Sequence, residues 1–223
     1  MKKQNLPSLF LSIGLFICFT LWTVLVKFID VQPIGANGSE VGFATLNAFV
    51  KNAVGVRLSL YVITDWLGIV PILVALCFAI FGLFQWIQRK NILKVDFDIL
   101  ALGVYYIIVI AIYIFFEITV INYRPILING YLEASYPSST TTLVLCVMPT
   151  ALIQSYARVK NKTLKYAVIF LTVAISLFML IGRILSGVHW ITDIIGGILI
   201  SLSLVLAYYS VIKRKLIDLY GNF

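Results

Sequence analysis

An all-α, polytopic membrane protein is the fold class that this sequence predicts. Hydrophobic residues occupy 61% of the 223 positions and charged residues only 12%, a balance far from that of an average soluble domain. The hydrophobic residues also gather in stretches of about 20 residues, the length of helix that crosses the hydrocarbon core of a bilayer. We therefore expect a single integral membrane domain over residues 1–223.

Six apolar stretches are expected to become transmembrane helices, at residues 9–29, 61–87, 99–121, 141–157, 164–185 and 191–212. The first is too long for the apolar region of a secretory signal, and no small-residue cleavage site follows it. We expect it to remain as a helix. Residues 41–56 are weakly amphipathic and follow a turn-rich segment, which predicts a short interfacial helix. For this segment we favour a helix resting at the headgroup level over a lid or lipid gate.

The basic residues indicate how the chain crosses the cell membrane. Most of the 17 Lys and Arg residues lie near the two termini or in the loops after the second and fourth apolar stretches. Because Lys and Arg accumulate in cytoplasmic loops, both termini are predicted to be cytoplasmic and the other loops extracytoplasmic. The net charge of +8 is then explained by contact with membrane lipids, and no nucleic-acid partner is expected.

The only histidine of the chain lies between the last two apolar stretches, close to an arginine and an aspartate. Ionisable residues at the edge of a bilayer are costly and commonly functional. Asp193 follows His189 by one helical turn, so its carboxylate can hold one ring nitrogen and leave the other free to attack. With Arg183 nearby, this pattern predicts a catalytic or phosphate-binding role for His189, where a lone histidine would be interpreted as structural.

Hydroxyl residues begin the fourth apolar stretch. Pro137 is followed by Ser138, Ser139 and Thr140 at the expected start of a helix, where backbone N–H groups and the helix dipole attract anions. An ordinary N-cap is the alternative interpretation. Because Arg124 and Arg183 are expected on the same side of the membrane, we favour a phosphate-binding site formed by these residues.

The three cysteines give no sign of a metal site or a disulfide framework. Cys18, Cys77 and Cys146 are isolated within apolar stretches, with no paired spacing. Buried cysteines of this kind behave as small hydrophobic residues. No metal and no cofactor are therefore expected.

Together these segments resemble the type 2 phosphatidic acid phosphatase and vanadium haloperoxidase superfamily. The signature of that family has a lysine, then Arg-Pro after six residues, then Pro-Ser-Gly-His, and then Ser-Arg with a histidine six residues later and an aspartate four beyond. This chain matches at Arg124-Pro125, Pro137-Ser138, Arg183, His189 and Asp193. The resemblance covers a core of about residues 60–212 and includes the six-helix layout.

The resemblance implies a lipid phosphatase that needs no metal, a phosphoric monoester or diphosphate hydrolase. His189 would attack phosphorus and Asp193 would orient it, while Arg124, Arg183 and the amides of Ser138 and Ser139 would bind the phosphoryl oxygens. The implied substrate is a phospholipid phosphate or a polyprenyl diphosphate at the outer face. The resemblance does not select between these lipids, and it predicts no oligomeric state.

Three positions depart from the signature of the family: Gly182 replaces the serine, Glu117 the lysine and Thr140 the histidine that protonates the leaving group. The last two make the site less cationic and remove a proton donor. A protonated Glu117 carboxyl could supply that proton, or the substrate head could carry its own cation. The alternative function is a relative that binds, carries or translocates phosphorylated lipids without hydrolysis. A transferase that uses an acceptor other than water is a further possibility.

Overall fold

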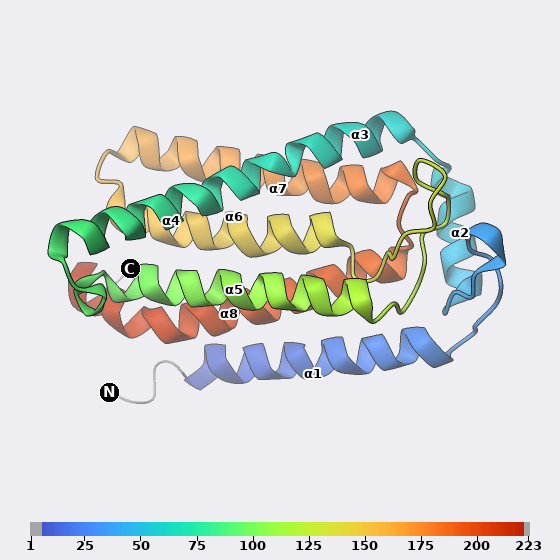
Figure 1. Cartoon of the computed structure of the whole chain (residues 1–223), viewed down its shortest axis with the longest axis horizontal. Helices are drawn as coiled ribbons and strands as arrows, with labels where there is room; N and C mark the ends of the chain where they lie inside the picture. The colour runs from blue at the N-terminus through green and yellow to red at the C-terminus, as the bar shows by residue number, and fades with distance from the viewer. Residues whose placement is uncertain (1–5, 221–223) are drawn as a thin grey trace.

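The computed structural model of the chain is a bundle of long helices with loops and one short helix gathered at one end (Figure 1). The structure describes the chain trace of residues 6–220 and the side chains of residues 7–213. The α-helices are α1 (Leu6–Phe28), α2 (Ala44–Val54), α3 (Leu58–Leu67), α4 (Ile69–Arg89), α5 (Phe97–Ile118), α6 (Ser139–Arg158), α7 (Lys162–Ser186) and α8 (Ile191–Tyr220). Short 3₁₀ turns occur at Ala36–Gly38 and Ile92–Lys94.

The six predicted membrane spans are confirmed within the described chain. Six helical segments are long and apolar enough to cross a bilayer, and they correspond to α1, the α3–α4 pair, α5, α6, α7 and the first part of α8. The short helix expected within residues 41–56 is α2, which lies across the end of the bundle (Figure 1). The protein is therefore a multi-pass, all-helical membrane protein.

The second span differs from the single uninterrupted helix that its hydropathy predicts. It divides at Gly68, whose N–H donates to the carbonyls of both Thr64 and Asp65. Pro71 lies three residues later and has no N–H, so it cannot donate the helical hydrogen bond to the carbonyl of Leu67. Hydropathy measures only length and polarity, so it does not register this break. The break separates α3, which carries Asp65 at the site, from the long membrane helix α4.

The helices that carry the site residues lie at the centre of the bundle. In its most apolar window, α6 has 56% of its residues buried and α8 has 44%, compared with 11% for the α3–α4 span. Figure 1 shows α1 alongside α8 at the edge of the bundle. These two helices exchange hydrogen bonds, from Ser12 Oγ to the Ser203 carbonyl at 2.8 Å and from Ser203 Oγ to the Ser12 carbonyl at 2.9 Å. Such bonds fix the packing of helices where the lipid supplies little hydrophobic driving force.

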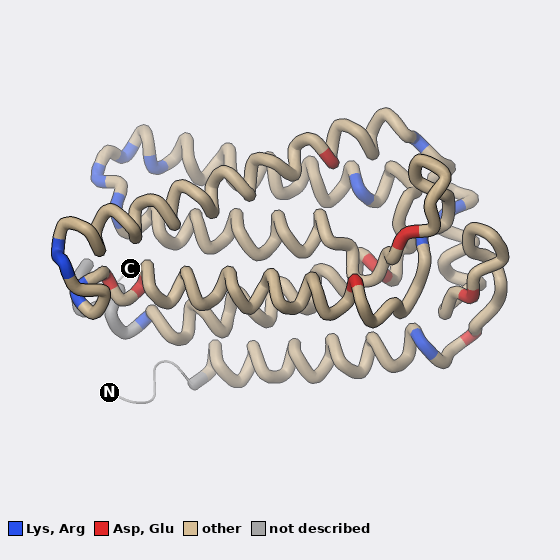
Figure 2. Tube along the Cα trace, in the orientation of Figure 1, with Lys and Arg blue, Asp and Glu red and all other residues tan. Residues whose placement is uncertain are grey.

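The two ends of the bundle differ in charge. Figure 2 shows mostly basic residues at the end that holds the α4–α5 and α6–α7 connections, whereas basic and acidic residues are mixed at the opposite end. At the basic end, the Arg158 guanidinium on α6 lies 2.7 Å from the buried Asp98 carboxylate on α5. This ion pair ties two helices together far from the site. Residues 1–5 and 221–223, on which the prediction of cytoplasmic termini partly depends, lie outside the described chain.

Candidate active site

His189 is placed by the tight turn that connects α7 to α8. Gly187 ends α7 in the left-handed conformation, with φ of +66°. A Cβ atom at this position would lie 2.0 Å from the Gly55 carbonyl oxygen, so only glycine fits. The turn therefore packs against the segment that follows α2. It leaves His189 buried, with 6% of its surface exposed.

The hydrogen bonds of His189 define its tautomer. Its Nδ1 atom lies 3.2 Å from the Ser135 carbonyl oxygen, and its Nε2 atom lies 3.3 Å from Nη1 of Arg124. A carbonyl can only accept and a guanidinium can only donate, so Nδ1 carries the proton and Nε2 presents its lone pair. Burial, together with the charges of Arg124 and Arg183, lowers the pKa of His189 well below its usual value. The imidazole is therefore neutral and has one nitrogen suited to nucleophilic attack.

Asp193 supports the imidazole less directly than its i, i+4 spacing predicts. Its Oδ2 atom lies 3.7 Å from His189 Nδ1, beyond the length of a good hydrogen bond. The carboxylate accepts instead from Ser135 Oγ at 2.5 Å, from the Trp190 N–H at 2.9 Å and from Asn122 Nδ2 at 3.3 Å. Because the Ser135 carbonyl bonds to His189, Asp193 holds the residue that in turn holds the imidazole.

Two arginines lie against Tyr61 beside this histidine. The guanidinium carbons of Arg124 and Arg183 lie 5.8 Å and 5.1 Å from the centre of the Tyr61 ring. Among the described residues, the buried Nε atoms of both arginines have no hydrogen-bond partner. Buried donors of this kind are normally satisfied, so the Nε atom of Arg183 is available to an oxyanion, whereas that of Arg124 lies beside a carboxylate.

Each arginine is also paired with a carboxylate that the sequence analysis missed. Arg124 Nε lies 3.0 Å from Glu133 Oε2, an ion-pair distance whose angle does not make a hydrogen bond. Arg183 Nη2 lies 3.2 Å from Asp65 Oδ1 and also donates to Thr140 Oγ1. The predicted charge balance omitted Glu133 and Asp65, so the acidic surroundings of the arginines extend beyond Glu117.

The hydroxyl residues at the start of α6 differ from the expected cradle in one respect. The Ser138 N–H donates to the Asp193 carbonyl at 3.1 Å, so this amide is already engaged. Its hydroxyl accepts from Thr141 Oγ1 at 3.0 Å. The prediction that the Ser138 amide binds phosphate is therefore not supported by this geometry, because the amide ties α6 to α8. Ser139 and Thr140 line a neighbouring cavity.

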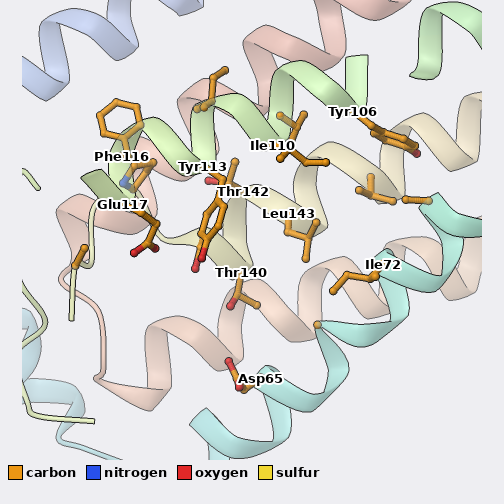
Figure 3. A pocket seen from close by; sticks show the side chains of 18 of the residues that line it. Asp65, Ile72, Tyr106, Ile110, Tyr113, Phe116, Glu117, Thr140, Thr142 and Leu143 are labelled. Atoms are coloured by element: carbon orange, nitrogen blue, oxygen red, sulfur yellow. The ribbon is translucent and has the colours of Figure 1, made fainter. Parts of the chain in front are cut away.

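That cavity has a volume of 520 Å³ and lies between α4, α5 and α6. Figure 3 shows the side chains of Glu117, Tyr113, Thr140 and Asp65 toward one side of the cavity, with Tyr106 on the other side. His189, Arg124 and Arg183 do not line this cavity, but two of its wall residues contact them: the Ser135 carbonyl accepts from the His189 ring, and Thr140 Oγ1 accepts from Arg183. Glu117 and Thr140, two of the three departures from the expected motif, thus share one cavity next to the arginine pair.

Further site residues come from positions that no spacing rule connects to His189. Asn122 and Ser135 come from opposite ends of the loop between α5 and α6, and Tyr61 comes from α3. Their signal in the sequence was only their position near Arg124 and Pro137. Within the described residues, no group of three or more His, Cys, Asp or Glu has the arrangement of a metal site. Cys18 and Cys77 are exposed and Cys146 is buried.

A family model described as the PAP2 superfamily matches residues 99–217. The match covers more than half of the chain and includes Glu117, Arg124, Arg183, His189 and Asp193. The protein belongs to the PAP2 superfamily, as the motif resemblance predicted.

The structure is also similar to the crystal structure of the first transmembrane PAP2 type phosphatidylglycerolphosphate phosphatase from Bacillus subtilis. The TM-score is 0.58 at 20% sequence identity, and the similarity covers 91% of this chain and 96% of that one. At this identity the similarity shows a shared fold. No match was found among curated proteins.

Proposed function

We propose that the protein is a lipid phosphatase that removes phosphate from a phospholipid phosphate or a polyprenyl diphosphate. The observation that carries this proposal is the neutral His189, whose Nε2 lone pair lies at the guanidinium of Arg124. A nucleophile and two cationic groups lie beside a cavity at one end of a membrane bundle. Membership of the PAP2 superfamily supports the same function.

In the proposed reaction, Nε2 of His189 attacks phosphorus and forms a nitrogen–phosphorus bond, while the bond between phosphorus and the lipid oxygen breaks. The Nδ1 proton stays on the ring and is held by the Ser135 carbonyl. Arg124 and Arg183 neutralise the phosphoryl oxygens as charge moves onto them. Water then attacks phosphorus, releases inorganic phosphate and restores the neutral imidazole.

The departing lipid oxygen needs a proton, and we assign its donation to Glu117. Thr140 occupies the motif position of the usual histidine, and Figure 3 shows Glu117 and Thr140 in the same cavity. In this role the Glu117 carboxyl gives a proton to the leaving oxygen and recovers one from the attacking water in the second step.

A second candidate function is a protein that binds phosphorylated lipids without hydrolysing them. The observation that favours it is the pairing of the arginines with Glu133 and Asp65, together with Thr140 at the position of the histidine. Such a site would hold a phosphate more weakly and would lack the usual proton donor.

The test of the proposed function is phosphate release by purified protein from phosphatidic acid, phosphatidylglycerol phosphate and a polyprenyl diphosphate. We expect release from at least one lipid by the parent chain, and a fall of more than about a hundredfold on His189→Ala. Binding of a lipid phosphate with no release from any of the three would contradict the phosphatase and support the binding protein.

The substitution Glu117→Gln separates the two functions. If Glu117 donates the proton, turnover falls while lipid binding is retained. If the protein only binds lipids, the substitution strengthens binding, because it removes a negative charge near the phosphate. Glu40→Gln, which alters an exposed carboxylate on the loop between α1 and α2, should change neither quantity. Unchanged turnover and unchanged binding after Glu117→Gln would contradict both roles for Glu117.

We also propose that the site faces the extracytoplasmic side of the cell membrane. The support is the gathering of basic residues at the opposite end of the bundle (Figure 2), since Lys and Arg favour the cytoplasmic side.

A further inference from the structure

The cavity next to the site continues into the membrane between α4 and α5. Ile72 on α4 and Ile110 on α5 line it, and each side chain is more than half exposed. These exposed edges face lipid, since both helices belong to membrane spans. A hydrocarbon chain can therefore enter sideways from the bilayer while its phosphate stays at the arginine pair.

The deep end of this cavity is closed by Tyr106. A second, smaller cavity of 260 Å³ lies deeper between the same two helices, and Tyr106 lines both. No other residue is shared by the two linings among the described side chains. In Figure 3, the Tyr106 ring lies at the far end of the cavity from Glu117. Tyr106 is therefore the partition between an upper cavity, beside the site, and a lower one.

The Tyr106 partition is held in place by its neighbours. Its hydroxyl lies 3.2 Å from Thr150 Oγ1 on α6, and its ring centre lies 5.6 Å from that of Tyr105. Thr150 also donates to the carbonyls of Cys146 and Val147, which fixes its own side chain. A side chain held on two sides is a defined end to the cavity.

The depth of the upper cavity along α5, from Glu117 to Tyr106, matches one leaflet. Residues 106–117 of α5 rise by about 16 Å, and half of a hydrocarbon core of about 30 Å is about 15 Å. An acyl chain of an ordinary phospholipid fits within this depth. A polyprenyl chain is longer than one leaflet, so its lower part would meet Tyr106 and would have to leave the cavity.

We infer that the upper cavity binds one hydrocarbon chain of the substrate lipid and that Tyr106 limits the length of chain that it holds. This inference rests on the proposed function, and it selects phospholipid phosphates over polyprenyl diphosphates as substrates. Methylenes beyond Tyr106 gain no contact with protein, so binding stops improving at a chain of leaflet length.

The inference is tested with alkyl phosphonates, which keep a phosphate-like head but cannot be hydrolysed at that bond. Their Kd is measured by calorimetry in one fixed detergent, for chains from shorter to longer than a leaflet. For the parent protein, we expect affinity to rise with chain length and then to level off. For Tyr106→Ala, we expect affinity to keep rising with chain length. The longest chains should bind this variant about tenfold more tightly than the parent, a factor at the lower end of the range for one added contact in an apolar pocket.

Three variants control this experiment. Tyr106→Phe keeps the ring and should keep the parental limit. Gly103 lies in the lower cavity, and an added Cβ would have no atom within 4 Å. Gly103→Phe alone should therefore leave the profile unchanged, while Gly103→Phe combined with Tyr106→Ala should refill the lower cavity and restore the limit. Should Tyr106→Ala fail to fold, Ile110→Phe raises the floor of the upper cavity and should shorten the preferred chain.

The outcomes distinguish this inference from the proposed function. A folded Tyr106→Ala protein with the parental length profile would overturn the role of Tyr106, even if lipid phosphate is hydrolysed. A parental profile that keeps rising beyond leaflet length would overturn it as well. If the phosphonates show the expected profiles but no lipid phosphate is hydrolysed, the chain-binding inference stands and the phosphatase does not.

Discussion

The Nε2 atom of His189 lies 3.3 Å from Nη1 of Arg124, so the residue that we propose as nucleophile touches a residue that we propose to bind its target. The contact fixes the imidazole as the acceptor and keeps its lone pair directed at the cationic group. When a phosphoryl group enters, its oxygens would replace the lone pair as acceptors for the guanidinium. Nε2 would then be free to attack.

The first prediction concerns the charge of His189, which is the only histidine in the chain. Burial and the two arginines lower its pKa, so a single labelled-histidine NMR signal should remain that of neutral imidazole below pH 6.5, the usual pKa. Arg124→Gln removes one of the positive charges that lower this pKa, so the pKa of His189 should rise. Arg89→Gln, at the opposite end of the bundle, should leave the pKa unchanged.

The same shift gives a pH dependence of stability with a definite sign. The unfolded chain takes up a proton on its histidine as pH falls through about 6.5, whereas the folded chain does not. The folded state is therefore destabilised as pH falls below that value, and the contribution of His189 is fully present above it. A His189 pKa at or above the usual value would contradict the neutral imidazole.

The second prediction tests whether Asp193 acts through Ser135. Ser135 Oγ donates to Asp193 Oδ2, so Asp193→Ala already removes this bond. The double variant with Ser135→Ala should then be little less stable or active than Asp193→Ala alone, which we expect to cost about 1–3 kcal/mol of stability. Ser176→Ala, on a distant part of α7, should add to Asp193→Ala independently. Full additivity for Ser135 would show that the two residues act separately.

The third prediction concerns the carboxylate beside Arg124. Glu133→Gln removes a carboxylate that competes with phosphate for the Arg124 guanidinium. Inorganic phosphate should then inhibit lipid-phosphate turnover, or displace bound lipid phosphate, more strongly. The expected gain is up to about fivefold, which is the range for a partly exposed ion pair. The gain should shrink at high salt. Glu40→Gln is the matched control. Weaker phosphate inhibition after Glu133→Gln would instead show that Glu133 positions Arg124.

The fourth prediction concerns topology. Asn129, in the loop between α5 and α6, and Lys90, at the end of α4, are both exposed and lie at opposite ends of the bundle. With Cys18 and Cys77 replaced, the Asn129→Cys variant should react with a membrane-impermeant thiol reagent on intact cells. The Lys90→Cys variant should react only after permeabilisation. The reverse pattern would place the site on the cytoplasmic side.

Much of the fold follows from the length of the apolar stretches. For this reason most of the predicted ends of the six spans lie within a few residues of the observed ends. The division of the second span at Gly68 was not predicted. Hydropathy measures how apolar a side chain is, and it takes no account of the N–H that Pro71 lacks. His189, Asp193 and Arg183 were identified because they lie close together in the sequence, although His189 belongs to the turn before α8 and not to the face of that helix.

The missed features all depend on contacts between distant segments. Glu133 and Asp65 lie on a loop and on α3, and only folding brings them to Arg124 and Arg183. The Ser138 amide was expected to be free, because a helix start shows its N–H groups without showing that the Asp193 carbonyl approaches them. Sequence spacing thus predicted which groups gather, but not which of them are already engaged with one another.

The most direct measurement of the central claim is the capture of a phosphoryl group on His189. Lipid phosphate labelled in its phosphoryl group is mixed with the purified protein, and the reaction is quenched in alkali, because phosphohistidine is labile to acid. We expect the label on the single histidine of the parent chain and none on His189→Ala. Phosphate release with no labelled histidine, persisting in His189→Ala at more than about a hundredth of the parental rate, would contradict a histidine nucleophile.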